Sequence, residues 1–223
     1  MSKYVKTVTE QIYQEIRSEI LMRKFRPGEK MTVKMLQEKY GVSSTPIREA
    51  LTRLQQDGLI DYQPNVGMNV VEYSEKDIKD IFTFMSELDV FAMRLALNAG
   101  KMAELVSELR YIQEQAAQRL EIRDCVGFED YSDQFHLAFY KFADNSRLSI
   151  AAEKTRIQLT VFSCVYQQTV ENQRSISKEH DQIVLLLAKG RYDEAETALR
   201  GHLVESMNKA LAENALFLKD LQP

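Results

Sequence analysis

Helix-breaking residues are concentrated at one end of this 223-residue chain. Three of its four prolines lie in the first 64 residues: Pro27, Pro46 and Pro64. Proline interrupts a helix because it lacks the backbone N–H and its ring clashes with the preceding turn. The proline-free stretch from residue 65 to residue 222 therefore favours long helices, whereas the first part must contain turns. We expect two domains, 1–73 and 74–223, as the chain length also favours.

Three helices are predicted in the first domain. Apolar residues recur every four positions along residues 8–20, which indicates one buried face of a helix. Thr32 is a candidate N-cap for a second helix that stops at Gly41, since glycine accommodates the left-handed turn conformation. Ser43 or Ser44 begins the third helix, which the following Asp-Gly pair closes.

A β-hairpin is expected to follow the third helix. Residues 59–62 and 68–71 form two short apolar runs. The sequence Pro-Asn-Val-Gly at residues 64–67 lies between them and is typical of a turn. Three helices followed by a hairpin form a winged helix, in which the hairpin is the wing.

The second domain is predicted to be an all-α antiparallel bundle. Ser-Glu-Lys-Asp at residues 74–77 is close to a capping box, and apolar residues then follow helical spacing to Gly100. Further helices are expected at 102–123, 127–143, 146–170, 176–189 and 192–213, with breaks at Asp124, Asp144-Asn145, Asn172 and Gly190. Six helices in roughly 150 residues are a usual size for a bundle. The predicted fold class is therefore mostly α: a winged helix-turn-helix followed by a helical bundle.

Charge and cysteine content narrow the classes of function. The net charge is −4, yet residues 1–73 hold 11 Lys/Arg and 9 Asp/Glu, a net charge of +2, and the remainder carries −6. A positive domain favours contact with a polyanion, although an asymmetry this small also arises by chance. There are two cysteines, no apolar stretch of about 18 residues and no apolar signal-peptide core. These features predict a cytoplasmic protein without a membrane span or a disulfide framework.

The second and third predicted helices form a helix-turn-helix pattern around residues 40–43. The third helix would be the recognition helix, whose N-terminal residues face base edges in the major groove of DNA. Pro46 is tolerated in its first turn, where a backbone N–H has no helical partner. Two packed helices without any DNA contact remain an alternative for this pattern alone, and the hairpin after it favours the winged helix.

The stretch LQEKYGVSSTPIREALTRLQQDGLIDYQPNVGMNV resembles the winged-helix domain of the GntR family of bacterial transcription regulators. The run Gly-Val-Ser-x-Thr-Pro-x-Arg-Glu-Ala-Leu is highly specific to that family. The preceding Phe-x-Pro-Gly at residues 25–28 matches as well, and the resemblance covers residues 8–72. It implies a DNA-binding function for the first domain.

The resemblance also implies a role for individual residues. Lys34 matches a basic position that touches the DNA backbone, and Thr45 and Arg48 match positions that contact phosphate and base edges. Gly67 matches the wing-tip glycine, which enters the minor groove. Ser44 occupies a DNA-facing position at which many relatives carry arginine.

Two points qualify these expected contacts. Val66 stands where relatives often carry a second arginine. With Ser44, two arginines of the family pattern are therefore absent, and the salt dependence of DNA binding should be weaker. Arg48 also has an alternative role, an ion pair with Glu49 or Asp57 on a solvated face. The usual operator of the family is therefore not assumed for this chain.

The second domain resembles the FCD domain, the all-helical ligand-sensing domain of the FadR branch, over residues 74–213. Its landmarks are SDQFHLAFYKFADN and KEHDQIVLLLAKGRYDEAETALRGHL. The three histidines of the chain, His136, His180 and His202, match positions where many FCD domains bind a metal. Neutral imidazole is a good ligand for Zn²⁺ or Ni²⁺.

The remaining pocket positions depart from the family pattern. Ser132 stands where the family places a fourth metal ligand, an aspartate, and Asp133 lies one residue further on. Asp133 is a candidate ligand that turns inward only if its helix rotates. Met85 replaces an arginine that helps to hold an anionic effector in relatives. Two alternatives follow for the pocket. Either it binds a metal through the three histidines together with water or effector, or it binds a ligand without a metal.

Together these features predict a homodimeric transcriptional regulator, more often a repressor in such families, that binds a pseudo-palindromic DNA operator. A small-molecule effector, by resemblance a small carboxylate, would control it. A regulator with a degenerate or metal-free pocket is one alternative. A metal-dependent helical enzyme is another, but it requires Glu-x-x-His spacing, whereas Glu179 and His180 are adjacent. We therefore expect no enzymatic activity.

Overall fold

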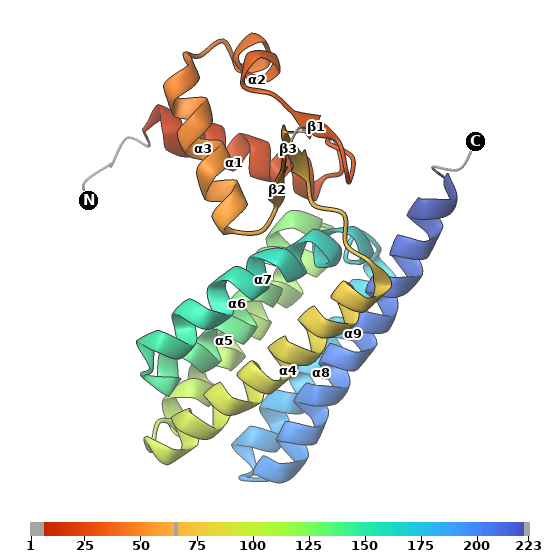
Figure 1. The fold of residues 1–223 in the computed structure, drawn as a ribbon. Helices are drawn as coiled ribbons and strands as arrows, with labels where there is room; N and C mark the ends of the chain where they lie inside the picture. Colours follow the sequence, from red (N-terminus) through yellow and green to blue (C-terminus); the bar gives the residue numbers. More distant parts are fainter. Residues whose placement is uncertain (1–6, 65–66, 221–223) are drawn as a thin grey trace. The chain divides into compact units, whose positions relative to one another are not determined.

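The computed structural model describes residues 7–64 and 67–220, without the side chains of residues 216–220. The chain forms two compact units, Met1–Ser74 and Glu75–Pro223, each with its own core (Figure 1). The division lies one residue after the predicted boundary. Residues 65 and 66 lie outside the described residues. They include the centre of the predicted hairpin turn and Val66, the position at which relatives often carry arginine.

The first unit has the predicted three helices and hairpin, plus one short strand. Its elements are α1 (Val8–Leu21), β1 (Lys30–Met31), α2 (Val33–Tyr40), α3 (Ser44–Gln56), β2 (Ile60–Gln63) and β3 (Gly67–Val70). The strands form an antiparallel sheet in the order β1-β3-β2. The pairing of Gln63 with Gly67 closes the hairpin, and Lys30 pairs with Asn69 on the opposite edge of β3. Two residues are too few to show a period in sequence, so β1 was not predicted.

The helix ends in this unit follow the expected local chemistry. Thr32 caps α2 by accepting a hydrogen bond from the Met35 N–H at 3.2 Å. Gly41 ends α2 with a φ of 67°, a left-handed conformation that costs glycine little. Leu36 on α2 and Ile47 on α3 are fully buried, so the two helices share one apolar core. That core holds the recognition helix candidate in a fixed orientation.

The second unit is a bundle of helices (Figure 1). Its elements are α4 (Glu75–Asn98), α5 (Met102–Glu121), α6 (Cys125–Ala143), α7 (Ser146–Tyr166), α8 (Val170–Ala188) and α9 (Tyr192–Asp220). Helix α4 packs against α6, α7 and α9, while α5 packs against α6 and α8. Within the ranges that the structure describes, no helix is long and apolar enough to cross a membrane.

Three of the four predicted breaks in the bundle are confirmed, and the break at Asn172 is wrong. Helix α7 ends at Tyr166, and α8 begins at Val170. Thr169 caps α8 by accepting a hydrogen bond from the Asn172 N–H, and the Asn172 side chain donates to the Tyr166 carbonyl at 2.7 Å. Asparagine therefore stabilises the first turn of this helix rather than ending one, because its amide reaches back to the preceding helix.

We predict that replacing glycine by alanine has opposite effects on stability at two positions, Gly41 and Gly201. Gly41 and Gly201 both have room for a Cβ atom, with no atom within 4 Å of it. Gly41 has a positive φ, so Gly41→Ala should lower the free energy of unfolding by about 1 kcal/mol. Gly201 lies within α9, where Gly201→Ala should raise it by about 0.5–1 kcal/mol.

Denaturant unfolding followed by circular dichroism measures both changes in the full chain. Equal effects of the two substitutions would contradict the backbone argument, because the two sites differ in φ and not in available space.

Candidate nucleic-acid interface and candidate metal centre

Helix α3 is held against α1 by polar contacts at its C-terminal end. The Tyr13 hydroxyl donates a hydrogen bond to Asp57 at 2.6 Å, and Arg53 forms an ion pair with Glu10 at 2.6 Å. The Arg53 guanidinium also lies 4.0 Å from the centre of the Tyr13 ring. Burial and the neighbouring Asp57 raise the pKa of Tyr13, so this hydroxyl remains a donor at neutral pH. These contacts fix the axis of α3 and leave its N-terminal end exposed.

The exposed side of the helix-turn-helix carries the predicted DNA contacts. Thr45 and Arg48 are exposed on α3, and Lys34 is exposed on α2. Ile47 and Leu51 form the opposite, buried side of α3. The side chains of Lys34 and Arg48 have no hydrogen-bond or ion-pair partner among the described residues, so both cations face solvent unpaired.

The alternative ion pair of Arg48 does not form within the described part of the chain. Glu49 instead accepts a hydrogen bond from the Thr9 hydroxyl at 2.7 Å. Asp57 accepts the hydrogen bond from Tyr13. Both candidate partners are therefore engaged with α1, and Arg48 is left available to a ligand outside the protein.

The first turn of α3 and the wing complete this surface. Ser43 is the N-cap residue of α3 but makes no side-chain hydrogen bond to the helix, which leaves first-turn N–H groups available to an anion. Ser44 is the first residue of the helix and is half-buried. Gly67 begins β3 with a φ of 107°, a conformation that L-residues rarely adopt.

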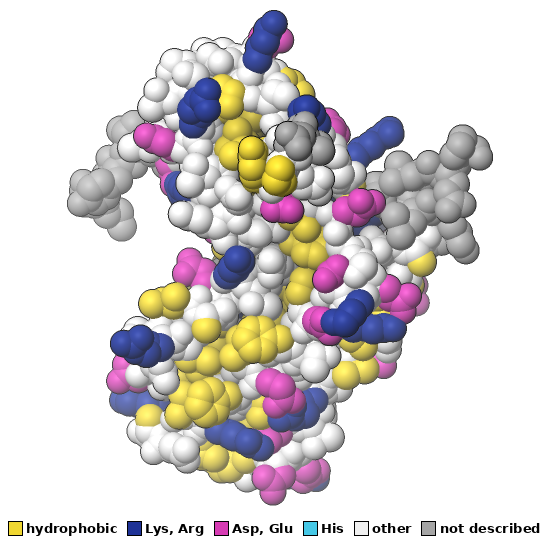
Figure 2. All heavy atoms as spheres, in the orientation of Figure 1, with side chains coloured by type: hydrophobic (Ala, Val, Ile, Leu, Met, Phe, Trp, Pro, Cys, Tyr) yellow, Lys and Arg dark blue, Asp and Glu magenta, His cyan; other side chains and the backbone are white. Residues whose placement is uncertain are grey.

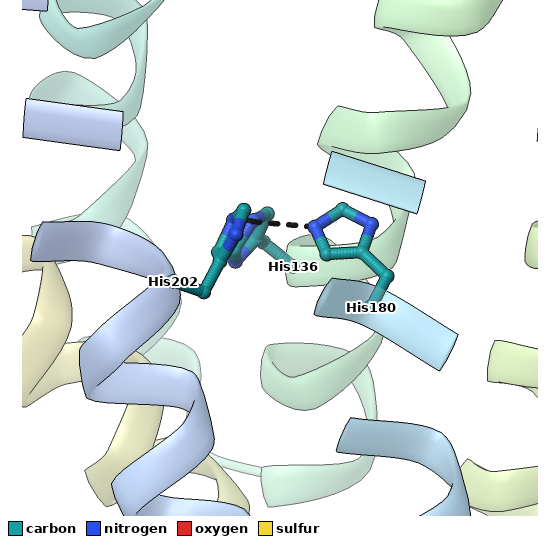
Figure 3. A group of neighbouring side chains, drawn as sticks. All are labelled: His136, His180 and His202. Carbon is teal, nitrogen blue, oxygen red and sulfur yellow. Dashed lines mark hydrogen bonds between the residues drawn. The ribbon is translucent and has the colours of Figure 1, made fainter. Parts of the chain in front are cut away.

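A second candidate site lies in the core of the bundle, where three histidines from three helices point toward one another (Figure 3). The Nε2 atom of His202 lies 3.2 Å from Nε2 of His180 and 3.3 Å from Nε2 of His136. All three side chains are buried. In a tetrahedral zinc site, Zn–N bonds of about 2.0–2.1 Å place the nitrogens about 3.3 Å apart. The spacing therefore fits a common metal ion.

The second nitrogen of each ring faces an acceptor from elsewhere in the bundle. His136 Nδ1 lies 2.7 Å from Asp89 Oδ2, and His202 Nδ1 lies 2.7 Å from Glu179 Oε2. His180 Nδ1 lies 3.3 Å from Gln113 Oε1. Such outer acceptors hold the Nδ1–H tautomer and turn the Nε2 lone pair toward a metal.

Two of the three histidines are held neutral by their surroundings. Burial lowers the pKa of His136 and His180 well below the usual value, and the neighbouring Arg156 and His202 add to this. Neutral imidazole is the ligand form that zinc requires, so these two rings suit a metal site.

The outer carboxylates are themselves held in place. Asp89 has no exposed surface and accepts a hydrogen bond from the Tyr140 hydroxyl at 2.5 Å. Burial raises the pKa of Asp89, while Arg156 and Tyr140 act against that rise. Although burial alone would raise the pKa of Glu179, its hydrogen bond with His202 brings that pKa below the usual value. Glu179 thus remains an anion that stabilises the ligand ring.

The other predicted pocket residues have different surroundings. Asp133 is not part of the histidine cluster: its carboxylate forms a 2.9 Å ion pair with Arg156. Ser132 is buried and lines a cavity beside the cluster. Met85 is fully buried one helical turn before Asp89 and does not line that cavity.

The cavity beside the histidines is small. Its volume is ≈ 10 Å³, about the minimum for one water molecule. His136 and His202 form part of its wall, together with Arg156 and Gln167. As the bundle stands, a ligand larger than water requires side chains at this wall to move.

Sequence reasoning missed the acceptors Asp89 and Gln113 and the buried Arg156. Each interrupts an apolar face of its own helix, as Asp89 does one turn after Met85 and Arg156 does one turn after Ala152. A lone charge in an apolar stripe is the signal that would have identified them, because a buried charge needs a partner.

Comparison with protein families identifies both domains. The model described as "Bacterial regulatory proteins, gntR family" matches residues 8–70, and the FCD domain model matches residues 80–205. The second match alone spans more than half of the chain. The chain belongs to the GntR family of bacterial regulators, in the branch with an FCD domain.

Relatives of this GntR-family protein match it over most of their length. An uncharacterized HTH-type transcriptional regulator, YdhC of Bacillus subtilis, is 26% identical over 198 residues, which is 86% of each chain. A probable D-xylose utilization operon transcriptional repressor of Paenarthrobacter nicotinovorans is 29% identical over 88% of this chain and 86% of its own length. The structure of E. coli McbR/YncC covers 93% of this chain and 97% of its own, with a TM-score of 0.67 and 23% identity, and shows the same fold.

The geometry predicts one metal ion per chain, bound by the three histidines. His180→Ala and His202→Ala should each abolish binding, since two imidazoles alone rarely hold zinc. Glu179→Gln should weaken zinc affinity about 10–100-fold, because it alters the acceptor that orients His202. Elemental analysis and zinc competition titrations, on protein purified without chelator or a histidine tag, measure these effects.

Glu171→Gln on the same helix is the matched control for Glu179→Gln, because Glu171 is exposed at the start of α8. Protein that never contains metal, or His180→Ala protein that retains a full equivalent, would contradict a three-histidine centre.

Proposed function

We propose that this protein is a homodimeric, cytoplasmic transcriptional repressor whose operator binding is controlled by an effector at a metal ion. The observation that carries this proposal is the convergence of three Nε2 atoms, each ring having its own outer acceptor. In a regulator, such a centre provides a site for recognising a ligand.

DNA binding is assigned to the winged helix because unpaired cations and free helix N–H groups lie on one surface of it. Arg48 would read base edges in the major groove, and Lys34 would contact the backbone. Thr45 and the first turn of α3 would contact phosphate. The net charge of +2 on residues 1–73 supports an approach to DNA. The repressor role rests on the name of the relative from Paenarthrobacter nicotinovorans.

Effector binding is assigned to the metal centre. His136, His180 and His202 would hold Zn²⁺ or Ni²⁺, and a three-histidine site leaves coordination positions open. When bound, the metal would act as a Lewis acid toward an oxygen ligand, which suits a small carboxylate effector. Asp133 is assigned to Arg156 rather than to the metal, because their ion pair already engages its carboxylate.

Asp89 provides a physical route from the effector site to the DNA-binding unit. It lies on α4, the helix that begins directly after the unit boundary, and it contacts the metal ligand His136. A change in the orientation of His136 would thus act on the helix that continues from the winged helix. An effector changes DNA affinity only if it binds the two states of this connection differently.

Dimerisation is assigned to the outer side of α4. A second apolar stripe runs along this helix at spacings of three and four: Ile81, Phe84, Leu88, Phe91 and Leu95. This is the spacing of a coiled-coil seam. Phe84 is 50% exposed and Phe91 48% exposed. Figure 2 shows hydrophobic side chains exposed over the region where α4 runs in Figure 1. A second copy of the helix would cover both phenylalanines.

The DNA assignment predicts opposite effects for two substitutions in α3. Arg48→Ala should lower affinity for a selected operator about tenfold or more, because one bidentate contact to a base is worth about 1–3 kcal/mol. Ser44→Arg should strengthen binding and steepen its salt dependence by about one phosphate contact. The operator is selected from a random DNA pool, and fluorescence anisotropy between 50 and 200 mM salt then gives both quantities.

Lys24→Ala serves as the control for charge, since Lys24 is exposed on the turn after α1. Equal losses in Lys24→Ala and Arg48→Ala would mean that only net charge matters. An unchanged salt slope in Ser44→Arg would mean that position 44 does not face DNA.

The dimer assignment predicts that the double substitution Phe84→Glu and Phe91→Glu yields monomers, because it would bury four carboxylates in the seam. Sedimentation velocity measures the change, and operator affinity should fall together with dimer content. Tyr111→Glu is the control, since Tyr111 is 57% exposed on α5. A double variant that remains dimeric at the same concentration would place the interface elsewhere.

A further inference from the structure

A polar hollow lies on one face of the three-stranded sheet in the first unit. Successive side chains of a strand point to opposite faces of the sheet. Ile60 and Val70 form one cross-strand pair and are buried in the core of the unit. Asp61 and Asn69 form the next pair, so their side chains lie on the opposite face. A hollow of ≈ 370 Å³, here called the sheet hollow, opens on this face, and its polar lining residues are Asp61, Gln63, Asn69 and Glu72.

Asn69 is the buried polar residue of the sheet hollow. It lies on β3, the central strand, and only 5% of its surface is exposed. Its backbone takes part in the ladders with β1 and β2, opposite Lys30 and Asp61. Its side-chain amide has no hydrogen-bond partner among the described residues. A buried amide without a partner costs free energy, so a ligand that reaches this group in the hollow gains a contact.

Two carboxylates border the hollow, and neither forms an ion pair within the described part of the chain. Asp61 lies on β2, where its Oδ1 atom accepts a hydrogen bond from the Tyr62 N–H at 2.8 Å. Glu72 follows β3, and its Oε2 atom lies 3.7 Å from the position that a Cβ atom on Gly28 would occupy. Because residue 28 is a glycine, the Glu72 carboxylate has room beside it at the wall of the hollow.

The charge of the lining is negative and uncompensated. Asp61 and Glu72 contribute a formal charge of −2, and no lysine or arginine of the described residues lines the hollow. Lys30 shares this face of the sheet, but its side chain extends toward the wing. Its Cε atom lies 3.5 Å from the position of a Cβ atom on Gly67, which is not part of the lining. The hollow therefore attracts a cation, and its carboxylate and amide oxygens are the ligand atoms that hard cations prefer.

We propose that the sheet hollow binds a hydrated divalent cation of the Mg²⁺ type. Asp61 and Glu72 bind the ion or its water shell, and the amide oxygens of Gln63 and Asn69 accept hydrogen bonds from the bound water. Mg²⁺ gives up its water reluctantly and is usually held through one or two carboxylates. The volume of ≈ 370 Å³ is far more than one water needs, so it accommodates the ion together with its water.

This site differs from the three-histidine centre in its ligands and in its place in the chain. It is built from residues of the first unit alone, and it offers oxygen rather than nitrogen ligands. A divalent ion there raises the net charge of residues 1–73 from +2 to +4 and so favours the approach to DNA. Cation binding itself does not depend on the proposed function of either unit.

Electron paramagnetic resonance of Mn²⁺ tests the site on the full chain. Mn²⁺ occupies the same oxygen sites as Mg²⁺, and the signal of the free ion falls when the ion binds. One equivalent of zinc is added first, so that the three-histidine centre does not take up Mn²⁺. We expect one Mn²⁺ per chain with a Kd of about 0.1–1 mM, the range of weak oxygen sites, and displacement by Mg²⁺.

Two variants assign this binding to residues. Asn69→Leu removes the amide without changing the charge and should weaken Mn²⁺ binding about threefold or more. The double substitution Asp61→Asn and Glu72→Gln should abolish it. Glu38→Gln is the matched control, because Glu38 is an exposed carboxylate on α2 of the same unit and lies outside the hollow. Circular dichroism confirms that each variant is folded.

Two competitors define the chemistry of the ligand. Hexaamminecobalt(III) resembles a hydrated ion but cannot exchange its ligands, so it should displace Mn²⁺ if the ion is held through its water shell. Failure of this competitor would overturn the hydrated state. Putrescine should displace Mn²⁺ much less effectively than Mg²⁺ does, and equal displacement would show that the hollow selects an organic cation instead.

The remaining outcomes separate this inference from the functions proposed above. Absence of bound Mn²⁺, or the same affinity in the wild type and in the Asp61→Asn, Glu72→Gln variant, overturns the site. Loss of Mn²⁺ binding in Glu38→Gln, to the extent seen in the double variant, would mean that only net charge matters. A failure of the chain to bind DNA leaves the Mn²⁺ count unchanged.

Discussion

The close approach of three imidazole nitrogens in a buried core is the constraint around which the polar residues of the second unit are arranged. Nitrogen lone pairs at 3.2–3.3 Å repel one another unless a cation or a proton lies between them. Burial makes protonation of His136 and His180 costly. Acceptors on the surrounding helices hold the three rings in this position.

All six helices of the bundle contribute a polar residue to this arrangement. The three histidines come from α6, α8 and α9, and their acceptors from α4, α5 and α8. Helix α7 supplies the remaining charge, Arg156. A polar network of this extent inside an apolar core is favourable only when each member is satisfied. Arg156 Nη1 and Gln167 Oε1 are among the buried atoms of the described residues that have no hydrogen-bond partner, so the network is not fully satisfied.

Local sequence patterns were sufficient to predict most of the helices and the hairpin, but not the contacts between helices. Helical periodicity and glycine positions gave most helix ends, because these depend on local chemistry. The break at Asn172 was wrong because the partner of its side chain, the Tyr166 carbonyl, lies across a turn that the pattern does not reveal. Asp89 and Arg156 were missed as site residues, since they meet through packing between helices distant in sequence. The same holds for β1, whose strand character comes from pairing with β3.

The two hydrogen bonds that the Asp89 carboxylate accepts connect helix α4 to helix α6. His136 and Tyr140 are one turn apart on α6, and both bond to this single carboxylate of α4. Two bonds at different heights prevent α6 from rolling about its axis relative to α4, so this pair of helices behaves as one stiff element. Helix α4 packs more extensively on α6 than α7 or α8 does. The α4–α6 pair would therefore transmit a displacement along its length as a lever rather than absorb it.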